Sequence, residues 1–398
     1  MTLGGADLQY KQISEVCEVV NGGTPKTKVE EYWGGDHQWI TPAEMGKREV
    51  PYVGESQRTL SDDGLAASSA SLIPPYSVIL STRAPIGHLV INTEPMAFNQ
   101  GCRGIVPGPS VDHKYLYYFL FANVGLLNDL GTGATFKELS AGKLKAVELP
   151  VPSLPEQERI VAILDEAFAA IDKAMANTER NLANVRELFD SHLKSAFTRD
   201  GEEIALSELA LEVTDGDHSP PPKAPTGIPF ITISNIVKHT REIDFSNTFS
   251  VPAEYFQGLK PNKTPRVGDI LYTVTGATLG IPVLVREKRD FCFQRHIGLI
   301  RPKPETDSAW LTYALLSPQA FRQATIGSTG AAQKTVSLRV LRSLKMPKVP
   351  LAEQKRTAEM LDALTEENQR LTRVYERKLV ATEALRKSLL HNAFNGEL

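Results

Sequence analysis

Two short segments of the sequence have residue types that occur in catalytic motifs. Ile73-Pro-Pro-Tyr76 has the Pro-Pro-aromatic part of a motif of amino-methyltransferases, in which a leading Asn or Asp accepts a hydrogen bond from the target amine. Isoleucine cannot accept that bond, and no Gly-rich loop for S-adenosylmethionine precedes it, so a turn before a strand is the better interpretation. Glu353-Gln-Lys355 has a carboxylate and a lysine, as some nucleases do, but no aspartate at a suitable distance upstream. We interpret Glu353 as a helix-start residue that complements the helix dipole.

Two further features have residue types that could bind ions or phosphates. His218 and His239 could be metal ligands, but no third ligand stands nearby at metal spacing, so we expect them in surface loops. The loop Gly131-Thr-Gly-Ala-Thr-Phe has half of a nucleotide-binding pattern, without a third glycine or a strand-loop-helix context. Because its threonines and Lys137 supply hydrogen-bond donors, it could contact DNA instead; a plain connecting turn is the alternative. The sequence therefore predicts no catalytic residue and no metal site.

Loop residues whose side chains pair with bases are candidates of another kind. Arg and Lys pair with guanine, and Asn or Gln with adenine. The candidates that rank highest lie at or next to Gly-containing loops that occur twice in the chain; they are Arg83, Gln100, Gln294, Arg295 and Lys334. The full set of predicted DNA-binding residues is Thr24, Lys26, Lys28, Lys47, Arg48, Arg58, Arg83, Gln100, Arg103, Thr132, Thr135, Lys137, His218, Lys223, Asn235, Lys238, Lys263, Thr275, Gln294, Arg295, His296, Thr329, Gln333 and Lys334. For each of them, a solvated surface side chain is the alternative.

Composition places bounds on this interpretation. The 398 residues carry a net charge of -3, with 12 basic and 15 acidic side chains in residues 1–145 and 17 and 14 in residues 201–345. A protein whose only task was to coat DNA would be far more basic, so local patches or other subunits would neutralise the phosphates. Cys17, Cys102 and Cys292 have no metal or disulfide spacing, and no apolar run approaches the ~20 residues of a membrane span. We therefore expect a protein of the reducing cytoplasm with no membrane partner.

The elements that would position these loops follow an internal repeat with a spacing of 197 residues. The match needs no gap across almost fifty residues, and a repeat this long is a domain plus a long segment rather than a solenoid unit. The matched residues include Pro150, Leu154, Glu156-Gln157, Arg159, Leu164-Asp165 and Ala196-Phe197 in the first copy, and Pro347, Leu351, Glu353-Gln354, Arg356, Leu361-Asp362 and Ala393-Phe394 in the second.

Each copy contains one long predicted helix, at residues 156–197 and 353–394. Apolar residues at alternating spacings of four and three are typical of a coiled-coil seam. A long helix with a narrow apolar stripe needs a partner, so we expect the two copies to fold back on each other as an antiparallel pair. Asn368 would fix the register on this seam, with an exposed position as the alternative. The predicted pairing residues are Ile160, Leu164, Ile171, Leu182, Val185, Leu361, Leu364, Asn368, Leu371 and Leu385.

A region of mixed α/β or mainly β character precedes each helix. β-type runs bounded by turn residues predict strands at 38–41, 77–80 and 89–91 in the first region, and at 229–233, 269–272 and 297–300 in the second. The two regions are distant copies that resemble each other less than the helices do, which suggests one frame with two heads for different targets. The predicted divisions are a first head at 1–148, a central long helix at 149–199, a second head at 200–345 and a C-terminal long helix at 346–398.

This layout resembles the specificity (S) subunit of type I restriction-modification systems over the whole chain. The motifs that carry the resemblance are Gly23-Thr-Pro25, Tyr32-Trp33-Gly34, Trp39-Ile-Thr, Ser81-Thr-Arg-Ala-Pro-Ile-Gly87, Asn99-Gln-Gly, the helix entry from Pro150 to Leu164, and Met346-Pro-Lys-Val-Pro350-Leu-Ala-Glu-Gln. Each piece is short, but their order and their duplication are specific. The second head has Asp215-Gly-Asp-His-Ser-Pro-Pro where the first has Gly-Gly-Thr-Pro, so the two heads should read different sequences.

The resemblance implies an α/β (α+β) fold, with two tandem mixed α/β target recognition domains separated by two long helices that form an antiparallel coiled coil in an internal pseudo-twofold repeat. It implies that each domain reads one half of a bipartite, asymmetric site in double-stranded DNA. The helices would set the spacer and dock two methyltransferase (modification) subunits, and a restriction subunit, a translocase and nuclease, would join them. The chain itself would be a non-catalytic subunit in DNA methylation and phage defence, and the partner subunits would bind S-adenosylmethionine, ATP and Mg.

Two other functions stay open. A stand-alone DNA-modifying enzyme would need the cofactor loop or the Walker lysine that the sequence lacks. A protein-binding coiled-coil scaffold would not need loops rich in Thr, Gly and basic residues, and salt-dependent DNA binding would distinguish a DNA reader from it. The target sequence and the spacer length depend on loop geometry and DNA shape, so they do not follow from residue types.

Overall fold

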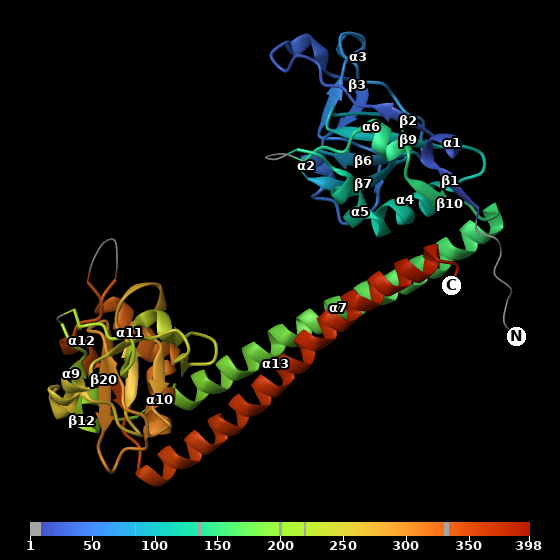
Figure 1. Ribbon diagram of the computed structural model, residues 1–398. Coiled ribbons are helices and arrows are strands. Elements are labelled where there is room, and N and C mark those ends of the chain that lie inside the picture. Colours follow the sequence, from blue (N-terminus) through green and yellow to red (C-terminus); the bar gives the residue numbers. More distant parts are fainter. Residues whose placement is uncertain (1–8, 84, 134–136, 199–200, 219, 330–333) are drawn as a thin grey trace, which may run out of the picture. The chain divides into compact units, whose positions relative to one another are not determined.

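The computed structural model describes residues 9–83, 85–133, 137–198, 201–218, 220–329 and 334–398. The chain forms two compact units, of which the first comprises Met1–Thr178 with Arg377–Leu398 and the second comprises Glu179–Glu376. Each unit therefore holds one head domain together with parts of two long helices, α7 (Leu154–Phe197) and α13 (Leu351–Phe394), shown in Figure 1. In the described part of the chain, no helix is both long and apolar enough to cross a bilayer.

The head of the first unit contains short strands that form a main sheet and a smaller one. The strands are β1 (Tyr10–Gln12), β2 (Cys17–Asn21), β3 (Trp33–Ile40), β4 (Tyr52–Val53), β5 (Arg58–Leu60), β6 (Val78–Thr82), β7 (Ile86–Asn92), β8 (Met96–Phe98), β9 (Cys102–Pro107) and β10 (Glu148–Pro150). The main sheet has the order β2-β9-β6-β7-β4, and the smaller sheet has the order β5-β3-β8. β1 pairs antiparallel with β10, and α7 begins only a few residues after β10.

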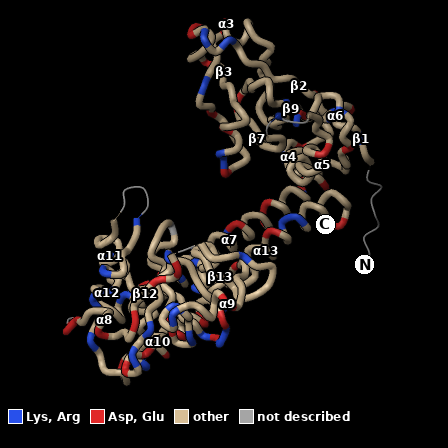
Figure 2. Tube along the Cα trace, turned by 60° about the vertical axis from the view of Figure 1, so that its left-hand side comes forward, with Lys and Arg blue, Asp and Glu red and all other residues tan. Residues whose placement is uncertain are grey.

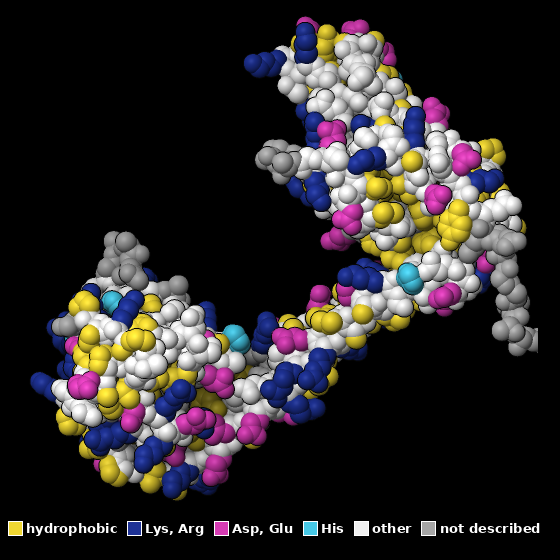
Figure 3. Space-filling view, viewed as in Figure 1, with side chains coloured by type: hydrophobic (Ala, Val, Ile, Leu, Met, Phe, Trp, Pro, Cys, Tyr) yellow, Lys and Arg dark blue, Asp and Glu magenta, His cyan; other side chains and the backbone are white. Residues whose placement is uncertain are grey.

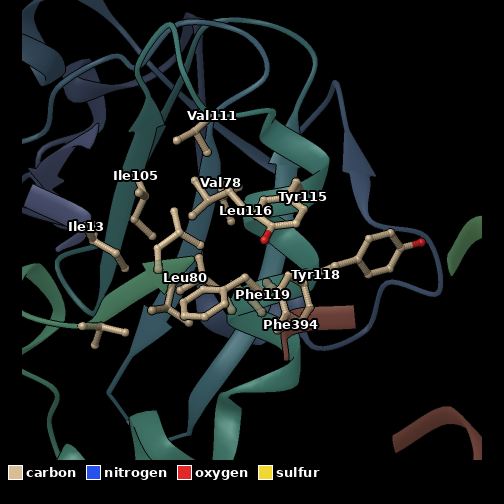
Figure 4. Close-up of a cluster of buried hydrophobic side chains, with 14 of the residues drawn as sticks. Ile13, Val78, Leu80, Ile105, Val111, Tyr115, Leu116, Tyr118, Phe119 and Phe394 are labelled. Atoms are coloured by element: carbon tan, nitrogen blue, oxygen red, sulfur yellow. The ribbon is translucent and has the colours of Figure 1, made fainter. Parts of the chain in front are cut away.

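Short helices surround these sheets and complete the hydrophobic core of the first head. They are α1 (Ile13–Val16), α2 (Pro42–Met45), α3 (Asp62–Ala66), α4 (His113–Ala122), α5 (Val124–Leu130), α6 (Ala141–Lys145) and the 3-10 turn η1 (Glu30–Tyr32). Apolar residues of α4 point into a cluster with the main sheet, and each fully buried side chain of this kind contributes about 1.5–3 kcal/mol. Figure 4 shows in this cluster Val78, Leu80, Ile105, Tyr115, Leu116, Phe119 and, from α13, Phe394.

The head of the second unit repeats this plan. Its strands are β11 (Glu203–Ala205), β12 (Ala210–Asp215), β13 (Ile228–Ile231), β14 (Ile236–Val237), β15 (Glu242–Ile243), β16 (Phe249–Val251), β17 (Ile270–Thr273), β18 (Pro282–Leu284), β19 (Cys292–Phe293), β20 (Ile297–Pro302) and β21 (Lys345–Pro347). The main sheet has the order β12-β20-β17-β18, which corresponds to β2-β9-β6-β7, and β16-β13-β19 corresponds to β5-β3-β8. The helices are α8 (Leu206–Leu209), α9 (Ala253–Gln257), α10 (Ser308–Leu316), α11 (Pro318–Ile326), α12 (Leu338–Ser343), and the turns η2 (Ile233–Asn235), η3 (Pro261–Lys263) and η4 (Gly276–Thr278).

The structure confirms the predicted strands and the duplicated mixed α/β architecture. The three predicted runs of the first head fall in β3, β6 and β7, and those of the second fall in β13, β17 and β20. Ile79 and Ile91 in the first head, like Ile270 and Leu299 in the second, are buried because these strands lie inside the main sheets. The short apolar runs were therefore a reliable signal for central strands.

The two long helices pack against each other in antiparallel orientation within each unit. In the first unit, Ile160 and Leu164 of α7 lie in one cluster with Leu390 of α13. In the second unit, Leu193 of α7 lies in one cluster with Leu361 of α13. Early residues of one helix thus contact late residues of the other. Each helix extends over 44 residues, close to the predicted length.

The prediction that Leu385 is a helix-pairing residue is wrong. Leu385 is 51% exposed, and its repeat mate Leu188 is 53% exposed. The seam instead uses Leu389, which is half-buried, and Leu390, which is buried. A helix with about 3.6 residues per turn drifts by about 20° per heptad, so a leucine placed by the heptad spacing alone rotates away from its partner. Among the other predicted pairing residues, Ile160, Leu164, Ile171, Val185 and Leu361 are buried, and Leu182, Leu364, Asn368 and Leu371 are half-buried.

Leu385→Ala is therefore expected to change the free energy of unfolding by less than about 0.5 kcal/mol, as exposed substitutions do. Ile171→Val removes a smaller group, but Ile171 is buried in the helix pair, so we expect it to cost about 1 kcal/mol. Urea denaturation of the two variants measures both values. A larger cost for Leu385→Ala than for Ile171→Val would contradict the corrected seam.

A buried glutamine near the start of each long helix attaches it to the head domain. Gln157 accepts a hydrogen bond from the backbone N–H of Asp112 (2.8 Å) and donates from Nε2 to the carbonyls of Ser110 (2.9 Å) and Pro152 (2.8 Å). Its repeat mate Gln354 accepts from the backbone N–H of Asp307 (2.8 Å) and donates to the carbonyl of Val349 (2.9 Å). The same hydrogen bond thus joins Asp112 to Gln157 and Asp307 to Gln354. This bond explains why the glutamine of the Glu-Gln pair occurs in both copies of the repeat.

Candidate nucleic-acid interface

The predicted base-reading loops of the first head meet at one end of its main sheet. We call residues 22–24, 82–83, 99–101 and 137–139 the first loop cluster. Backbone hydrogen bonds join its members, and the side chain of Thr24 accepts from Asn99 Nδ2 (2.9 Å). The backbone bonds, each written from N–H to carbonyl, are Gly23 to Phe98 (3.0 Å), Asn99 to Ile40 (2.9 Å), Cys102 to Asn99 (2.9 Å), Thr82 to Gly101 (2.8 Å) and Leu139 to Thr82 (2.9 Å).

The loops of the second head repeat this backbone frame bond for bond. We call residues 216–218, 274–275, 294–296 and 334–336 the second loop cluster. Lys263 adds a hydrogen bond from Nζ to the carbonyl of Gly216 (2.9 Å). The backbone bonds are Asp217 to Phe293 (3.2 Å), Gln294 to Ile231 (3.0 Å), Ile297 to Gln294 (3.1 Å), Val274 to His296 (3.0 Å) and Val336 to Val274 (2.8 Å).

Equivalent positions on this shared frame carry different side chains. The N–H of Asn99 bonds to the last residue of β3, and the N–H of Gln294 bonds to the last residue of β13. Gln100 and Arg295 come directly after these two residues, and both are exposed. Amides pair with adenine, and guanidinium groups with guanine, so this position alone would make the two heads prefer different bases. Lys137 and Lys334 are also equivalent and exposed, and they keep the same residue type. The shared backbone frame thus fixes the positions of these side chains, while the residue type at each position can differ between the heads.

Several predicted residues hold these clusters together and are less available to a ligand. Arg83 is half exposed and forms an ion pair with Glu138 (2.9 Å), which ties the end of β6 to the neighbouring loop. Arg103 donates to the carbonyl oxygens of Gln100 (3.1 Å) and Cys102 (2.8 Å). His218 is exposed and lies 2.7 Å from an Asp215 carboxylate oxygen. Exposed ion pairs of this kind are weak, so Arg83 and His218 are still able to exchange their partners for phosphate or a base.

Three predicted contacts need correction because their side chains are used inside the second or first head. Asn235 is 4% exposed, and its amide bonds to Thr232 and to the carbonyl of Asn247 (2.9 Å). Thr275 is also 4% exposed, with its hydroxyl facing Thr335. Arg48 donates to the buried carboxylate of Glu44 (3.0 Å) and to the carbonyl of Glu55 (2.7 Å). These groups stabilise loops and are not presented for base reading.

The remaining predicted residues are exposed or half-buried in other parts of the heads, or lie outside the described residues. Thr132 and Thr329 are exposed and pair with Glu138 and Thr335 as isolated bridges. Gln294 and His296 are half-buried members of the second loop cluster. Thr135 and Gln333 lie outside the described residues. Exposed basic residues away from the two clusters are Lys26, Lys28, Lys47, Arg58, Lys223 and Lys238.

A cation-aromatic stack in the first head was missed from the sequence. The Arg58 guanidinium lies 3.5 Å from the ring centre of Trp33, and Trp33 packs edge-on against Trp39 at 5.1 Å. Trp39 in turn donates from Nε1 to the carbonyl of Gly23 (2.9 Å), in the first loop cluster. Arginine on an aromatic face is pre-organised for phosphate or base contacts. Trp33 and Trp39 stand within the resemblance motifs, but only the fold shows that Arg58 of β5 lies over them.

Basic and acidic side chains are mixed on both heads, with a local gathering of basic ones on the first (Figure 2 and Figure 3). Figure 2 shows basic and acidic residues interspersed along the trace, as the net charge of -3 requires. In Figure 3, basic side chains of the first head gather on the side that carries β3 and α2. Local patches of this kind fit a DNA ligand whose remaining phosphates are neutralised by other subunits.

The segments that suggested catalysis have structural roles. Tyr76 ends the Pro-Pro-Tyr turn with a φ of 61°, is exposed, and leads into β6, as predicted for a turn before a strand. Glu353 lies in the first turn of α13. Among the described residues, no group of three or more His, Cys, Asp or Glu side chains could hold a metal ion. Burial raises the pKa of the Cys102 and Cys292 thiols to about 12, so these cysteines are not poised as nucleophiles.

Most of the chain matches a known protein family. The family model described as the type I restriction modification DNA specificity domain matches residues 6–180 and 217–376. The chain belongs to this family. The first matched segment contains the first head and the second contains most of the second head, and each also includes the first part of the helix that follows.

Named proteins and a solved structure are similar to this chain. The type I restriction enzyme MjaIX specificity subunit of Methanocaldococcus jannaschii is 28% identical over 335 residues, which are 78% of this chain and 76% of that protein. The EcoR124I/EcoR124II specificity subunit of Escherichia coli is 29% identical over 167 residues, 40% of this chain and 41% of that protein. The HsdS subunit from Thermoanaerobacter tengcongensis has a TM-score of 0.65 at 18% identity, and covers 100% of both chains.

A second solved structure extends the likeness in fold. It is a chain from a type I R-M system, solved to explain complex assembly and conformational transition, with a TM-score of 0.77 at 19% identity and 98% of both chains covered. The fold of this chain, with two mixed α/β heads and two long helices, is therefore that of these two solved structures, and the predicted fold class is confirmed.

Proposed function

We propose that this chain is the DNA sequence-specificity subunit of a type I restriction-modification complex, in which each head reads one half of a bipartite, asymmetric site. The observation that carries the proposal is the pair of loop clusters, which share one backbone frame but present Gln100 in the first head and Arg295 in the second. Two domains that read different half-sites need the same backbone frame with different exposed side chains. The named relatives are specificity subunits, which supports a non-catalytic role.

The long helices would set the spacer and dock partner subunits. Leu188 and Leu385 stand 197 residues apart and are both about half exposed, so each helix presents an apolar side chain at the equivalent position. The recurrence of an exposed leucine at the same place in both copies of the repeat suits a partner present in two copies. We therefore place two methyltransferase subunits on the helices, with S-adenosylmethionine, ATP and Mg in partner subunits. A restriction subunit would complete the assembly in the cytoplasm.

The test is base-resolution methylome sequencing of a host that expresses this chain with its cognate methyltransferase subunit. We expect methylation at a split motif, and replacement of residues 201–345 by another head should change only one half of it. Within the second head, Arg295→Ala should relax one base position, because a bidentate contact discriminates by about 1–3 kcal/mol. Arg322→Ala is the matched control, since Arg322 is exposed on α11 outside the loop cluster.

Other outcomes separate the alternatives. Methylation that ignores this chain, or that lacks a split motif, would remove the specificity-subunit function and leave a protein-binding scaffold in its place. Methylation by the chain without any partner would show a stand-alone enzyme.

A further inference from the structure

A tyrosine on each head donates a hydrogen bond to an aspartate on the long helix that follows it. Tyr118 of α4 donates to Asp165 of α7 (2.5 Å), and Tyr313 of α10 donates to Asp362 of α13 (2.7 Å). The two aspartates belong to the 197-residue repeat, and the tyrosines occupy equivalent places on equivalent helices. We call these the first and second Tyr-Asp contacts.

Both tyrosines are buried, and the carboxylates that accept their hydrogen bonds are 38% exposed for Asp165 and 39% for Asp362. Tyr118 is 7% exposed and packs edge-on against Phe168 at 5.5 Å, and Tyr313 is 5% exposed. Burial, and then the hydrogen bond to Asp165, raise the pKa of Tyr118 well above its ordinary value. Burial also raises the pKa of Tyr313 to about 12. Both phenols therefore stay protonated and remain donors at neutral pH.

Each Tyr-Asp contact is the second of two attachments along the same short helix. The first is the bond from the N-cap of α4 or α10, Asp112 or Asp307, to the glutamine of the long helix. Asp112 and Tyr118 are six residues apart, which is about 9 Å along a helix. These polar attachments add direction to the apolar packing of each head on the long helices. Two attachments this far apart along one helix fix the direction in which the head points.

The two contacts differ in how well the aspartate is supported. In the first unit, Lys114 also binds the Asp165 carboxylate, at 2.6 Å. In the second unit, the corresponding support is Arg286, which is 65% exposed and 3.4 Å from Asp362. A cavity of about 560 Å³ lies beside this contact, between the second head and α13, and Arg286 and Asp362 are among its lining residues. The carboxylate of Asp362 thus has a longer and more exposed ion pair than that of Asp165, while the hydroxyl of Tyr313 also lies 3.0 Å from Thr365 Oγ1.

We propose that Tyr118 and Tyr313 are positioning residues that fix the orientation of each recognition domain on its helix, and through it the spacer length at which both half-sites are read together. The proposal rests on the proposed function of the chain. The contacts do not touch DNA, so the bases read within each half-site should not depend on them. The second contact should be the more sensitive of the two, because Lys114 still holds Asp165 when the phenol of Tyr118 is lost.

The experiment uses Tyr118→Phe and Tyr313→Phe in the full chain, assembled with its methyltransferase subunits. Methylation rates are measured on duplexes with the natural spacer and with spacers one base pair shorter and longer. For Tyr313→Phe we expect the preference for the natural spacer to fall about tenfold, the equilibrium equivalent of one hydrogen bond to a charged group. Tyr118→Phe should lower it less. The bases recognised in each half should not change.

Tyr117→Phe is the matched control. Tyr117 lies on the same helix and stacks on Phe121, and no hydrogen bond of its hydroxyl occurs in the described part of the chain. It should keep the wild-type spacer preference. Asp362→Asn retains an oxygen that accepts from Tyr313 and should also keep that preference, whereas Asp362→Ala should lose it. This contrast separates positioning from a general loss of folding.

The outcomes are distinguishable. Wild-type spacer preference in folded Tyr313→Phe and Asp362→Ala complexes would overturn the positioning proposal and leave the proposed function intact. If the wild-type complex methylates no split site on any of the duplexes, the proposed function fails and the positioning proposal fails with it. Faster hydrogen exchange of α10 in free Tyr313→Phe, with α4 unchanged, would support the second Tyr-Asp contact independently of DNA.

Discussion

Asp269→Ala is expected to lower the free energy of unfolding of the second unit by about 3–5 kcal/mol, the usual cost of removing one partner of a buried ion pair. Asp269 is 2% exposed and accepts two hydrogen bonds from the Arg301 guanidinium (2.9 and 2.7 Å) and one from the backbone N–H of Arg266 (2.8 Å). Asp269 precedes β17, and Arg301 lies on β20, so the pair joins the turn before one central strand to its neighbour.

The cost is large because both partners are shielded. The Arg301 side chain is 16% exposed, and without Asp269 its charge would keep only carbonyl acceptors, such as that of Thr264 (3.0 Å). Arginine keeps its proton in proteins, so the guanidinium of Arg301 cannot become neutral to relieve the loss of Asp269. An unpaired buried charge of this kind is more destabilising than the intact pair is stabilising.

Urea denaturation followed by tryptophan fluorescence measures the effect. Trp310 is buried in the core of the second unit, whereas Trp33 and Trp39 belong to the first. Replacing Trp33 and Trp39 by Phe leaves Trp310 as the reporter of the second unit. Asp290→Ala, an exposed acidic residue of the same head, is the control and should change stability by less than about 0.5 kcal/mol. A cost for Asp269→Ala no larger than that of the control would show that the ion pair contributes nothing.

Gln157→Ala is expected to destabilise the first unit by about 3 kcal/mol, because it removes three hydrogen bonds to part-buried backbone groups at about 1 kcal/mol each. The side chain is fully buried, and the groups it serves are the N–H of Asp112 and the carbonyls of Ser110 and Pro152. Gln354→Ala should cost about 2 kcal/mol in the second unit, because Gln354 makes two such bonds instead of three.

Gln157→Ala should lower the free energy of unfolding more than Gln354→Ala does. Both substitutions remove the same atoms from the same helix position, so the cavity left behind is comparable, and the difference reports the extra hydrogen bond. Gln369→Ala, an exposed glutamine on α13, is the control and should be neutral within about 0.5 kcal/mol. Equal costs for Gln157→Ala and Gln369→Ala in urea denaturation would show that the buried amide is not what attaches the first head.

The sequence alone determined the architecture of this protein. The 197-residue repeat predicted two heads and two long helices, and short apolar runs between turn residues predicted the central strands. These features are readable because helix and strand periods are local properties of the chain. The repeated Glu-Gln and Leu-Asp pairs also stood out, and the structure gives their reason: Gln157 and Asp165, like Gln354 and Asp362, attach a head to its helix.

Only the tertiary structure decided which polar side chains are available to a ligand. Asn235 and Arg295 have equally suitable side chains for base reading, yet Asn235 is buried and bonded within its head, and Arg295 is exposed. Tyr118 gave no signal, and Arg58 was predicted as a DNA contact without its stack on Trp33, because the partners Asp165 and Trp33 are distant in sequence or lie on another strand. Residue type fixes what a group can bind, but burial and the neighbours brought by folding fix what it does bind.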